Sequence, residues 1–226
     1  MSTPRLLILE TSHQPGVVAL AAGDRILSER RLDEARRHAR DLAPATAALL
    51  AEQGWRAPDL DGVVVSLGPG SYTGLRVGIM SAKALAYATG CRLLGVETFA
   101  AIAPQAPDAA DAVDVIADAQ QDKVYLQRFR RTEGWQAITP LRISPFTDWL
   151  ATLPPDVWVT GPGLAKHREQ LPATVQVAPA EDWHPRASSL LGLALERWRR
   201  GERDDPFAVE PLYLRPSSAE EKWAGR

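Results

Sequence analysis

Residues 62–76 read GVVVSLGPGSYTGLR, an apolar run that continues into a glycine-rich loop. The run at 62–67 is short, apolar and β-branched, which predicts a strand buried on both faces. A helix is expected from about Thr73 to Ala88, so the order is strand, glycine loop, helix. Such a junction presents free backbone N–H groups and a partial positive charge to an anion. The candidate anion or nucleotide contacts in the loop are Gly68, Gly70, Ser71, Tyr72, Thr73 and Gly74.

The loop does not match the standard phosphate-binding motifs. A P-loop needs Gly-Lys-Ser/Thr after its spacer, no such lysine is present, and the glycine spacing is GxGxxxG rather than GxGxxG. A structural interpretation explains the same residues: a tight turn in which Ser71 or Thr73 is the N-cap of the helix. From the residues alone, both interpretations stay open.

The rest of the first half extends outward from this segment. Three strands open the chain, and a helix follows with Asp41 as N-cap, so that Pro44 lies in the first turn, where its missing N–H is no loss. The expected elements are strands 6–10, 17–22 and 25–31, the helix after Asp41, strand 62–67, helix 73–88, strand 92–96 and helix 98–103.

The second half repeats this order after the connection PQAPDAAD at 104–111. Its expected elements are strands 113–118, 124–131 and about 135–143, helix 146–153, strand 156–160, helix 164–171, strand 175–177 and helix 186–200. We therefore predict an α/β protein of two related subdomains with mixed sheets flanked by helices. The predicted subdomains are residues 1–105 and 106–226, with a C-terminal tail able to pack back on the first.

Composition narrows the functional classes. The 226 residues carry a net charge of −2, which is not the footprint of a chain that binds nucleic acid unaided. Cys91 is the only cysteine, so it makes no disulfide within the chain, and we expect it to be a small core residue. No secretory signal and no apolar run of about 20 residues is present, so we expect a cytoplasmic protein without a membrane partner.

The first strand of each half ends in a carboxylate. Glu10, followed by Thr11, and Asp118 would together suit a hydrated Mg²⁺ carrying a nucleotide if they faced each other across a cleft. For either acid taken alone, a turn acid at a strand end is the favoured explanation. The turn after Asp118, residues 119–123, has no glycine, so we expect it to be less able to curl around phosphates than the turn with Gly16.

Neither metal nor peptidase chemistry is supported by motif. His13, His38, His167 and His184 are too dispersed for a metal-binding helix motif. Ser71 does not lie in G-x-S-x-G, because Pro69 occupies the place of the first glycine. A triad of Ser71, His38 and Asp118 can be drawn on paper, as in any chain, and we assign no catalytic residue.

A ridge of small residues follows the glycine loop. Gly74, Gly78, Ala82 and Ala86 recur every four residues, which places them along one side of a helix where another helix can approach closely. That helix is either the chain's own preceding helix or one from a partner subunit. We predict a partner interface made of this ridge and the apolar side of the preceding helix, with Leu42 and Leu49.

Taken together, several segments resemble the TsaB (YeaZ) family. They span about Leu6 to Arg215 and are LLILETS, RHARDLAPATAALL, GPGSYTGLR, VIADAQQDKVY and PLYLR. The second of these segments contains His38, which we add to the predicted partner interface. The resemblance implies an actin-like, sugar-kinase-like (ASKHA) fold. It also implies a non-catalytic subunit of the complex that makes threonylcarbamoyladenosine next to the anticodon of tRNA.

The resemblance further implies a set of partners. These are a TsaD-type catalytic subunit, a TsaE-type ATPase, tRNA reached through the complex, and a second copy of the chain when TsaD is absent. No cofactor is required, and ATP with Mg²⁺ is expected only in the assembled complex. The family usually has Asp where this chain has Glu10 and Arg where it has Gln120. The alternatives are an ATP-dependent enzyme of the sugar-kinase-like superfamily and a glycoprotease-like peptidase.

Overall fold

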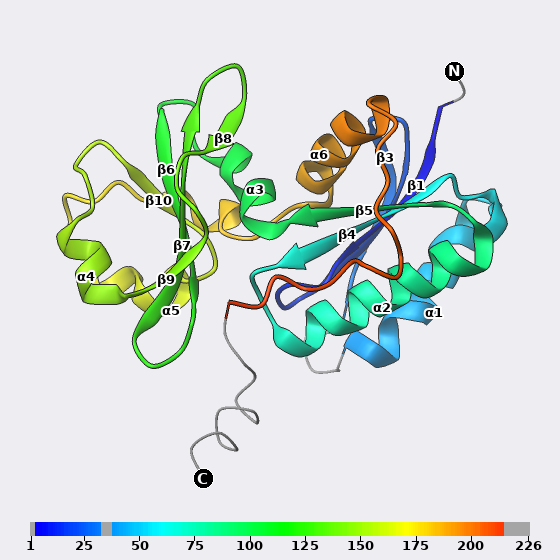
Figure 1. Ribbon diagram of the computed structural model, residues 1–226, viewed down its shortest axis with the longest axis horizontal. Coiled ribbons are helices and arrows are strands. Elements are labelled where there is room, and N and C mark those ends of the chain that lie inside the picture. The colour runs from blue at the N-terminus through cyan, green and yellow to red at the C-terminus, as the bar shows by residue number, and fades with distance from the viewer. Residues whose placement is uncertain (1–2, 33–37, 215–226) are drawn as a thin grey trace, which may run out of the picture.

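The computed structural model describes residues 3–32 and 38–214, except the side chains of residues 38 and 39. The chain forms two lobes side by side, each built around a mixed sheet (Figure 1). The first sheet has the order β3-β2-β1-β4-β5, with antiparallel pairing among the first three strands and parallel pairing from β1 to β4 and β5. Its strands are β1 (Arg5–Glu10), β2 (Val17–Ala22), β3 (Arg25–Arg31), β4 (Gly62–Gly68) and β5 (Arg92–Glu97).

Helices cover both faces of the first sheet (Figure 1). Because successive strand residues point to opposite faces, Leu7 and Leu9 of β1 face α1 (His38–Glu52) and α2 (Tyr72–Thr89), while Leu6 and Ile8 face α6 (Ala187–Arg199). A 3₁₀ turn, η1 (Ala57–Asp59), precedes β4. Helix α3 (Thr98–Ile102) and η2 (Ala103–Gln105) lead into the second lobe.

The second sheet has the order β10-β6-β7-β8, and β9 also pairs with β7. Its core is anchored by Asp114 on β6, a buried carboxylate that accepts two hydrogen bonds from Arg128 and one from the Trp149 indole. The elements of this lobe are β6 (Ala112–Asp118), β7 (Lys123–Arg131), β8 (Trp135–Ala137), β9 (Arg142–Pro145), α4 (Phe146–Ala151), β10 (Trp158–Thr160), α5 (Leu164–His167), η3 (Arg168–Gln170) and η4 (Ala180–Asp182).

Two mixed sheets flanked by helices are the α/β architecture predicted from the sequence. Three local predictions are corrected. Helix α1 begins at His38, so Asp41 lies in its first turn and Pro44 inside the helix. Residues 135–143 form two strands, β8 and β9, because the chain leaves β7 after Ala137 and pairs with it again further along.

The third correction concerns α6, which the order of elements assigned to the second half. Leu190, Leu191 and Ala194 of this helix pack against the first sheet instead, where they cover the face that α1 and α2 leave open. The following segment stays on the first lobe: the Asp204 N–H donates to the Leu93 carbonyl, and the Leu212 N–H donates to the Leu67 carbonyl. The division into residues 1–105 and 106–226 stays a prediction.

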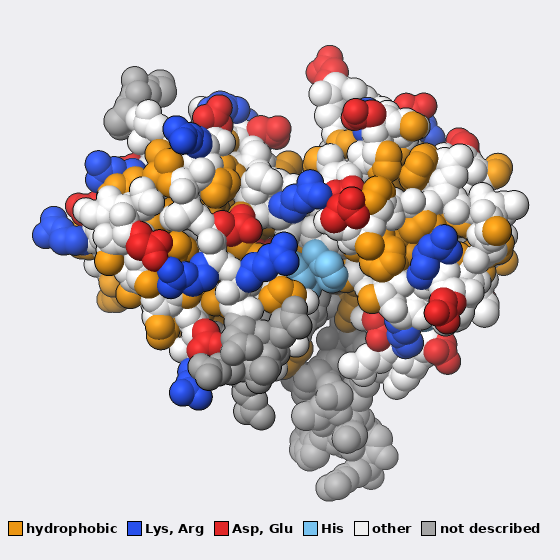
Figure 2. All heavy atoms as spheres, turned by 180° about the vertical axis from the view of Figure 1, so that it is seen from behind, with side chains coloured by type: hydrophobic (Ala, Val, Ile, Leu, Met, Phe, Trp, Pro, Cys, Tyr) orange, Lys and Arg blue, Asp and Glu red, His pale blue; other side chains and the backbone are white. Residues whose placement is uncertain are grey.

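The surface carries charges of both signs. Figure 2 shows basic and acidic side chains interspersed with hydrophobic ones over both lobes, so this face has no stripe of a single sign. None of the helices within residues 38–214 is both long and apolar enough to span a bilayer.

Candidate site between the two lobes

The glycine loop packs directly on the turn that follows β1. A Cβ at Gly70 would lie 2.2 Å from the Ser12 carbonyl oxygen, and the Ser71 N–H donates to that same oxygen at 2.6 Å. Gly68 has φ of +103°, which favours glycine, and its N–H donates to the Thr98 hydroxyl. The two loops therefore fit against each other at the carboxyl ends of β1 and β4.

The N-cap interpretation of the loop is confirmed for Ser71. Its hydroxyl accepts a hydrogen bond from the Gly74 N–H at 3.2 Å, which caps α2, whereas Thr73 lies within the helix. The N–H groups of Ser71 and Gly74 are thus engaged by the chain itself. Binding of an anion by the loop stays a prediction.

Glu10 is buried and caps its own turn. Its Oε1 accepts hydrogen bonds from the Ser12 N–H at 2.6 Å and the Ser12 hydroxyl at 2.5 Å, and His13 Nδ1 lies 3.3 Å away. Among the described residues, Glu10 Oε2 and the Thr11 hydroxyl, both buried, have no hydrogen-bond partner. The first carboxylate is therefore a turn acid that faces inward.

Asp118 has different surroundings. It is exposed, lies 3.1 Å from the Lys166 ammonium and accepts a hydrogen bond from the Gln120 N–H. The glycine-free turn does curl: Gln120, Gln121 and Asp122 all have φ between +51° and +62°, at a cost of about 1–2 kcal/mol per residue. Since Glu10 is sequestered and Asp118 is paired, the contacts do not fit a Mg²⁺–nucleotide bridging these two acids.

Two histidines meet at the junction of the lobes. The rings of His13 and His184 stack with centroids 4.4 Å apart and planes 14° from parallel. Burial, and then the neighbouring His13, lower the pKa of His184 to about 4, so His184 is neutral at pH 7. In the described part of the chain, neither Nδ1 atom donates or accepts a hydrogen bond.

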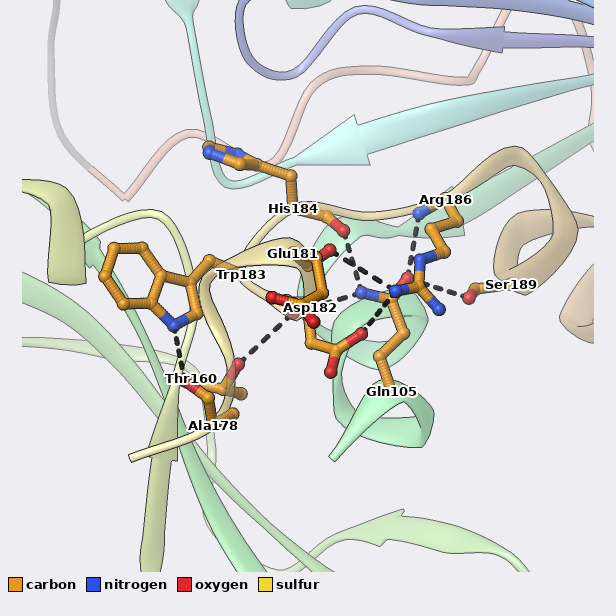
Figure 3. A network of polar contacts seen from close by, with 9 residues as sticks. All are labelled: Gln105, Thr160, Ala178, Glu181, Asp182, Trp183, His184, Arg186 and Ser189. Carbon is orange, nitrogen blue, oxygen red and sulfur yellow. Dashed lines mark hydrogen bonds and ion pairs between the residues drawn. The ribbon is translucent and has the colours of Figure 1, made fainter. Parts of the chain in front are cut away.

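A network around Gln105 holds the backbone beneath His184 (Figure 3). The Gln105 amide donates to the carbonyls of Asp182 and His184 at 3.1 and 2.7 Å. Its Oε1 accepts from the Arg186 N–H and the Ser189 hydroxyl at the start of α6. One side chain from η2 thus fixes the segment that returns from the second lobe to the first.

The predicted partner interface is corrected, because the ridge of small residues lies in the chain's own core. Ala82 and Ala86 are buried with Leu42 and Leu49 in the cluster between the first sheet, α1 and α2. A Cβ at Gly78 would lie 2.1 Å from the Thr11 hydroxyl. Gly74 is buried as well, and the side chain of His38 lies outside the described residues. The close packing is real, but its partner is the same chain.

The opposite sides of these two helices are exposed. We call the exposed side chains Ala43, Ala47, Ala51, Met80, Ala84 and Tyr87 the outer face of α1 and α2. Met80 and Tyr87 are 61% and 75% exposed, and Phe207, 78% exposed, meets the Tyr87 ring edge-on at 5.9 Å.

The remaining candidates take structural roles. Cys91 is half-buried against the first core, where burial raises the pKa of its thiol. His167 is buried and stacks on Phe146. Ser71 caps α2 and Asp118 pairs with Lys166, so these two are not arranged as members of a triad. Within the described ranges, no group of three His, Cys, Asp or Glu side chains could hold a metal ion.

Sequence reasoning missed the part that His13, His184 and Gln105 play. His13 lies three residues after Glu10, and this spacing was the only available signal. His184, which stacks on His13, lies 171 positions further along the chain (184 minus 13). The segment that brings it there has no recognisable motif.

Comparison with known proteins gives the family. The family model described as "TsaD: tRNA N6-adenosine threonylcarbamoyltransferase" matches residues 26–223. The Bacillus subtilis tRNA threonylcarbamoyladenosine biosynthesis protein TsaB is 27% identical, over 96% of this chain and 97% of its own length. The structure of YeaZ from Pseudomonas aeruginosa superposes with a TM-score of 0.80 at 29% identity, covering 95% of this chain and all of that chain.

The chain belongs to the TsaD-type threonylcarbamoyltransferase family, as a TsaB (YeaZ) member. A Paracoccus denitrificans tRNA N6-adenosine threonylcarbamoyltransferase is also 43% identical, over 33% of this chain and 21% of its own length. In this TsaB-family chain, Glu10 and Gln120, which differ from the residues usual in the family, both fit their surroundings. Glu10 reaches Ser12 through its longer side chain, and Gln120 begins the left-handed turn.

Proposed function

We propose that this TsaB-family chain is a non-catalytic scaffold subunit of the complex that makes threonylcarbamoyladenosine in tRNA, and that it pairs with a TsaD-type catalytic subunit. Participation in this pathway is supported by TsaB-named relatives over nearly the full length and by the family match at 26–223. A TsaE-type ATPase and tRNA join through the complex. This chain needs no cofactor of its own, ATP with Mg²⁺ enters only after assembly, and the complex works in the cytoplasm.

The non-catalytic role rests on one observation: the titratable side chains near the junction of the lobes already interact with groups of this chain. A general acid or base must reach the proton it transfers, within about 3 Å of the reacting group. Glu10 is instead enclosed by its own turn, and Asp118 is paired with Lys166. His13 and His184 cover each other's faces. These contacts favour a scaffold over the kinase and peptidase alternatives.

The outer face of α1 and α2 is the surface we propose for pairing. Met80, Tyr87 and Phe207 offer large exposed apolar side chains, and Ala43 and Ala47 leave room for a partner helix. The TsaD-type family model matches this chain, so a TsaD-type subunit is expected to present a similar helix pair. For the same reason, two copies of this chain can use the surface when that subunit is absent.

Size-exclusion chromatography of this chain mixed with its cognate TsaD-type protein tests the proposal. We expect Met80→Asp combined with Tyr87→Asp to weaken the complex at least tenfold, since buried aromatic anchors typically contribute about 2 kcal/mol or more. Ile138→Asp, at a 45% exposed apolar residue of the second lobe, is the control and should leave the complex intact. Equal effects of the two changes, or no effect of the first, contradict this interface.

A second measurement tests the non-catalytic role. The wild-type chain should be required for threonylcarbamoyl transfer to tRNA by the reconstituted complex, and should neither hydrolyse ATP nor cleave peptides alone. Transfer at full rate without this chain contradicts the proposal.

A further inference from the structure

A groove crosses the first lobe at the end of the sheet opposite to the junction. It has a volume of about 730 Å³ and is lined by Pro4, Asp24, Arg92, Trp198 and Arg199, among others. A second hollow of about 380 Å³ lies on the other side of Arg92, between the end of α2 and the segment with Arg203. Because Arg92 lines both, we treat them as one surface, the arginine groove.

The arginines in and beside this groove differ in their pairing. Beside it, Arg197 pairs with Glu202 and Asp204, and Arg200 pairs with Glu202. Arg199 and Arg203 are exposed and, within residues 3–32 and 38–214, form no ion pair. Two guanidinium groups therefore remain available at the rim for an external anion.

Arg92 adds an aromatic stack to the groove. Its guanidinium carbon lies 4.3 Å from the centroid of the Trp198 ring, and no carboxylate in the described chain pairs with it. Trp198 is fixed from beneath, since a Cβ at Gly62 would lie 3.0 Å from its ring. The flat Arg–Trp pair is a platform of the kind on which nucleic-acid bases stack.

The acidic residues nearby leave a local positive balance. Asp204 is neutralised by Arg197, whereas Asp205 accepts a hydrogen bond from the Phe207 N–H and keeps its charge. Asp24 and Asp205 are thus the two carboxylates of the lining that no arginine of the described chain neutralises, against the three guanidinium groups of Arg92, Arg199 and Arg203. Guanidinium groups match phosphate and carboxylate oxygens alike in geometry and charge, and the Arg92–Trp198 platform, on which a base can stack, favours a nucleic acid over a carboxylate-rich peptide.

We propose that the arginine groove binds the phosphate backbone of RNA, and so gives this subunit a direct contact with the tRNA. The identity of the RNA rests on the proposed function. An extended polyanion fits better than a small nucleotide because the cationic groups lie along two joined hollows rather than around one enclosed pocket. The net charge of −2 makes this contact an addition to other contacts in the complex and not a stand-alone RNA site.

Binding of fluorescent tRNA to the assembled complex, measured by anisotropy at several salt concentrations, tests this inference. Arg199→Ala with Arg203→Ala should weaken binding about tenfold and lower the slope of log affinity against log salt by about two, because each arginine neutralises one phosphate. Arg130→Ala with Arg142→Ala removes the same charge from exposed positions of the second lobe and should change neither quantity. Arg92→Lys keeps the charge but removes the planar stack and should weaken binding with little change in slope.

Each other outcome overturns the RNA assignment. Equal losses of affinity for both double variants show a general charge effect, and an unchanged affinity shows that RNA does not touch the groove. Competition by ATP, with loss of ATP binding in the Arg199/Arg203 variant, assigns the groove to a free nucleotide. Chromatography of the same variants with the TsaD-type subunit separates the scaffold proposal from the RNA proposal. A variant that fails to form the complex tests the scaffold role, whereas one that forms the complex but loses tRNA tests the arginine groove.

Discussion

Gly70 has no room for a side chain. Its Cβ position lies 2.2 Å from the Ser12 carbonyl oxygen and 2.8 Å from the Ser12 Cβ, and the first of these is backbone. We expect Gly70→Ala to lower the free energy of unfolding by about 2–3 kcal/mol, because the two loops must separate to admit a methyl group. Chemical denaturation of the isolated chain measures this.

Gly192→Ala is the matched control. Nothing lies within 4 Å of a Cβ at Gly192, which is exposed in α6, so the same substitution should raise stability by up to about 1 kcal/mol through helix propensity. Equal effects of the two changes would show that the glycine loop is a permissive linker.

His184 makes stability depend on pH. Its ordinary pKa of 6.5 falls to about 4 in the folded chain, first through burial and then through His13. Between these values the unfolded chain binds a proton that the folded chain does not, so the free energy of unfolding decreases as the pH falls from about 6.5 to 4. Because the ring is only partly buried, we expect a loss of about 1–2 kcal/mol over this window.

Thermal unfolding at a series of pH values measures this effect. His184→Phe keeps a flat ring on His13 but cannot titrate, so its melting temperature should fall less steeply below pH 6.5. A variant whose pH dependence equals that of the wild type would contradict the assignment.

At this scale, local chemistry could be predicted and long-range chemistry could not. Ser71 as an N-cap and Glu10 as a turn acid both follow from residues within a few positions of each other. The stack of His13 on His184 depends on where the chain returns after the second lobe, and no local pattern encodes that.

At the scale of elements, α2 shows what periodicity can and cannot predict. The four-residue spacing of small residues indicated close packing on one side, and Ala82 is indeed fully buried. It could not indicate the neighbour, because a sheet, an adjacent helix and a partner subunit all require the same small residues. Here Thr11 of the first turn fills the space above Gly78.

Ala82→Leu and Ala84→Leu form a matched pair on this helix. Ala82 lies in the core, so the larger side chain should lower the free energy of unfolding of the monomer by about 1–3 kcal/mol. Ala84 lies on the outer face, so the same change should leave the melting temperature within about 1 °C and alter only partner binding. Calorimetry measures the stability of both variants, and chromatography measures their partner binding. A stable Ala82→Leu chain that binds its partner poorly, with a destabilised Ala84→Leu chain, would place the ridge of small residues at the partner interface instead.

Other element boundaries depended on tertiary pairing. Pro44 suggested a helix start near Asp41, but α1 continues back to His38, and the proline lies inside. The split between β8 and β9 is set by two separate pairings with β7, which the continuous sequence 135–143 does not reveal.

For the whole molecule, the order of elements correctly indicated two mixed sheets but not which sheet α6 covers. The apolar side of α6 fits any sheet face, and the choice is made by the open face of the first sheet. The return is then secured at the edge strand: Arg197 pairs with Asp204, whose carboxylate accepts from the Gly95 N–H. Burial alone would raise the pKa of Asp204, but these two partners outweigh burial and lower it.

Gln105 joins the lobes through this return segment, and its removal is the last prediction. All four of its hydrogen bonds go to residues 182–189, and the Thr160 hydroxyl of the second sheet donates to the same Asp182 carbonyl (Figure 3). Gln105→Ala leaves the half-buried His184 carbonyl and Ser189 hydroxyl without this partner, which we expect to lower the free energy of unfolding by about 2–3 kcal/mol.

The form of the transition separates this role from ordinary destabilisation. If Gln105 couples the lobes, Gln105→Ala should broaden the single calorimetric transition or split it into two, because the return segment then holds α6 and the second sheet together less firmly. Gln136→Ala, at an exposed position of β8, should leave the transition sharp and unmoved. A Gln105→Ala chain that melts lower but in one equally sharp step would make Gln105 a local contact, and the coupling of the lobes would then rest on the apolar contacts of Phe99 and Ile102 with the second sheet.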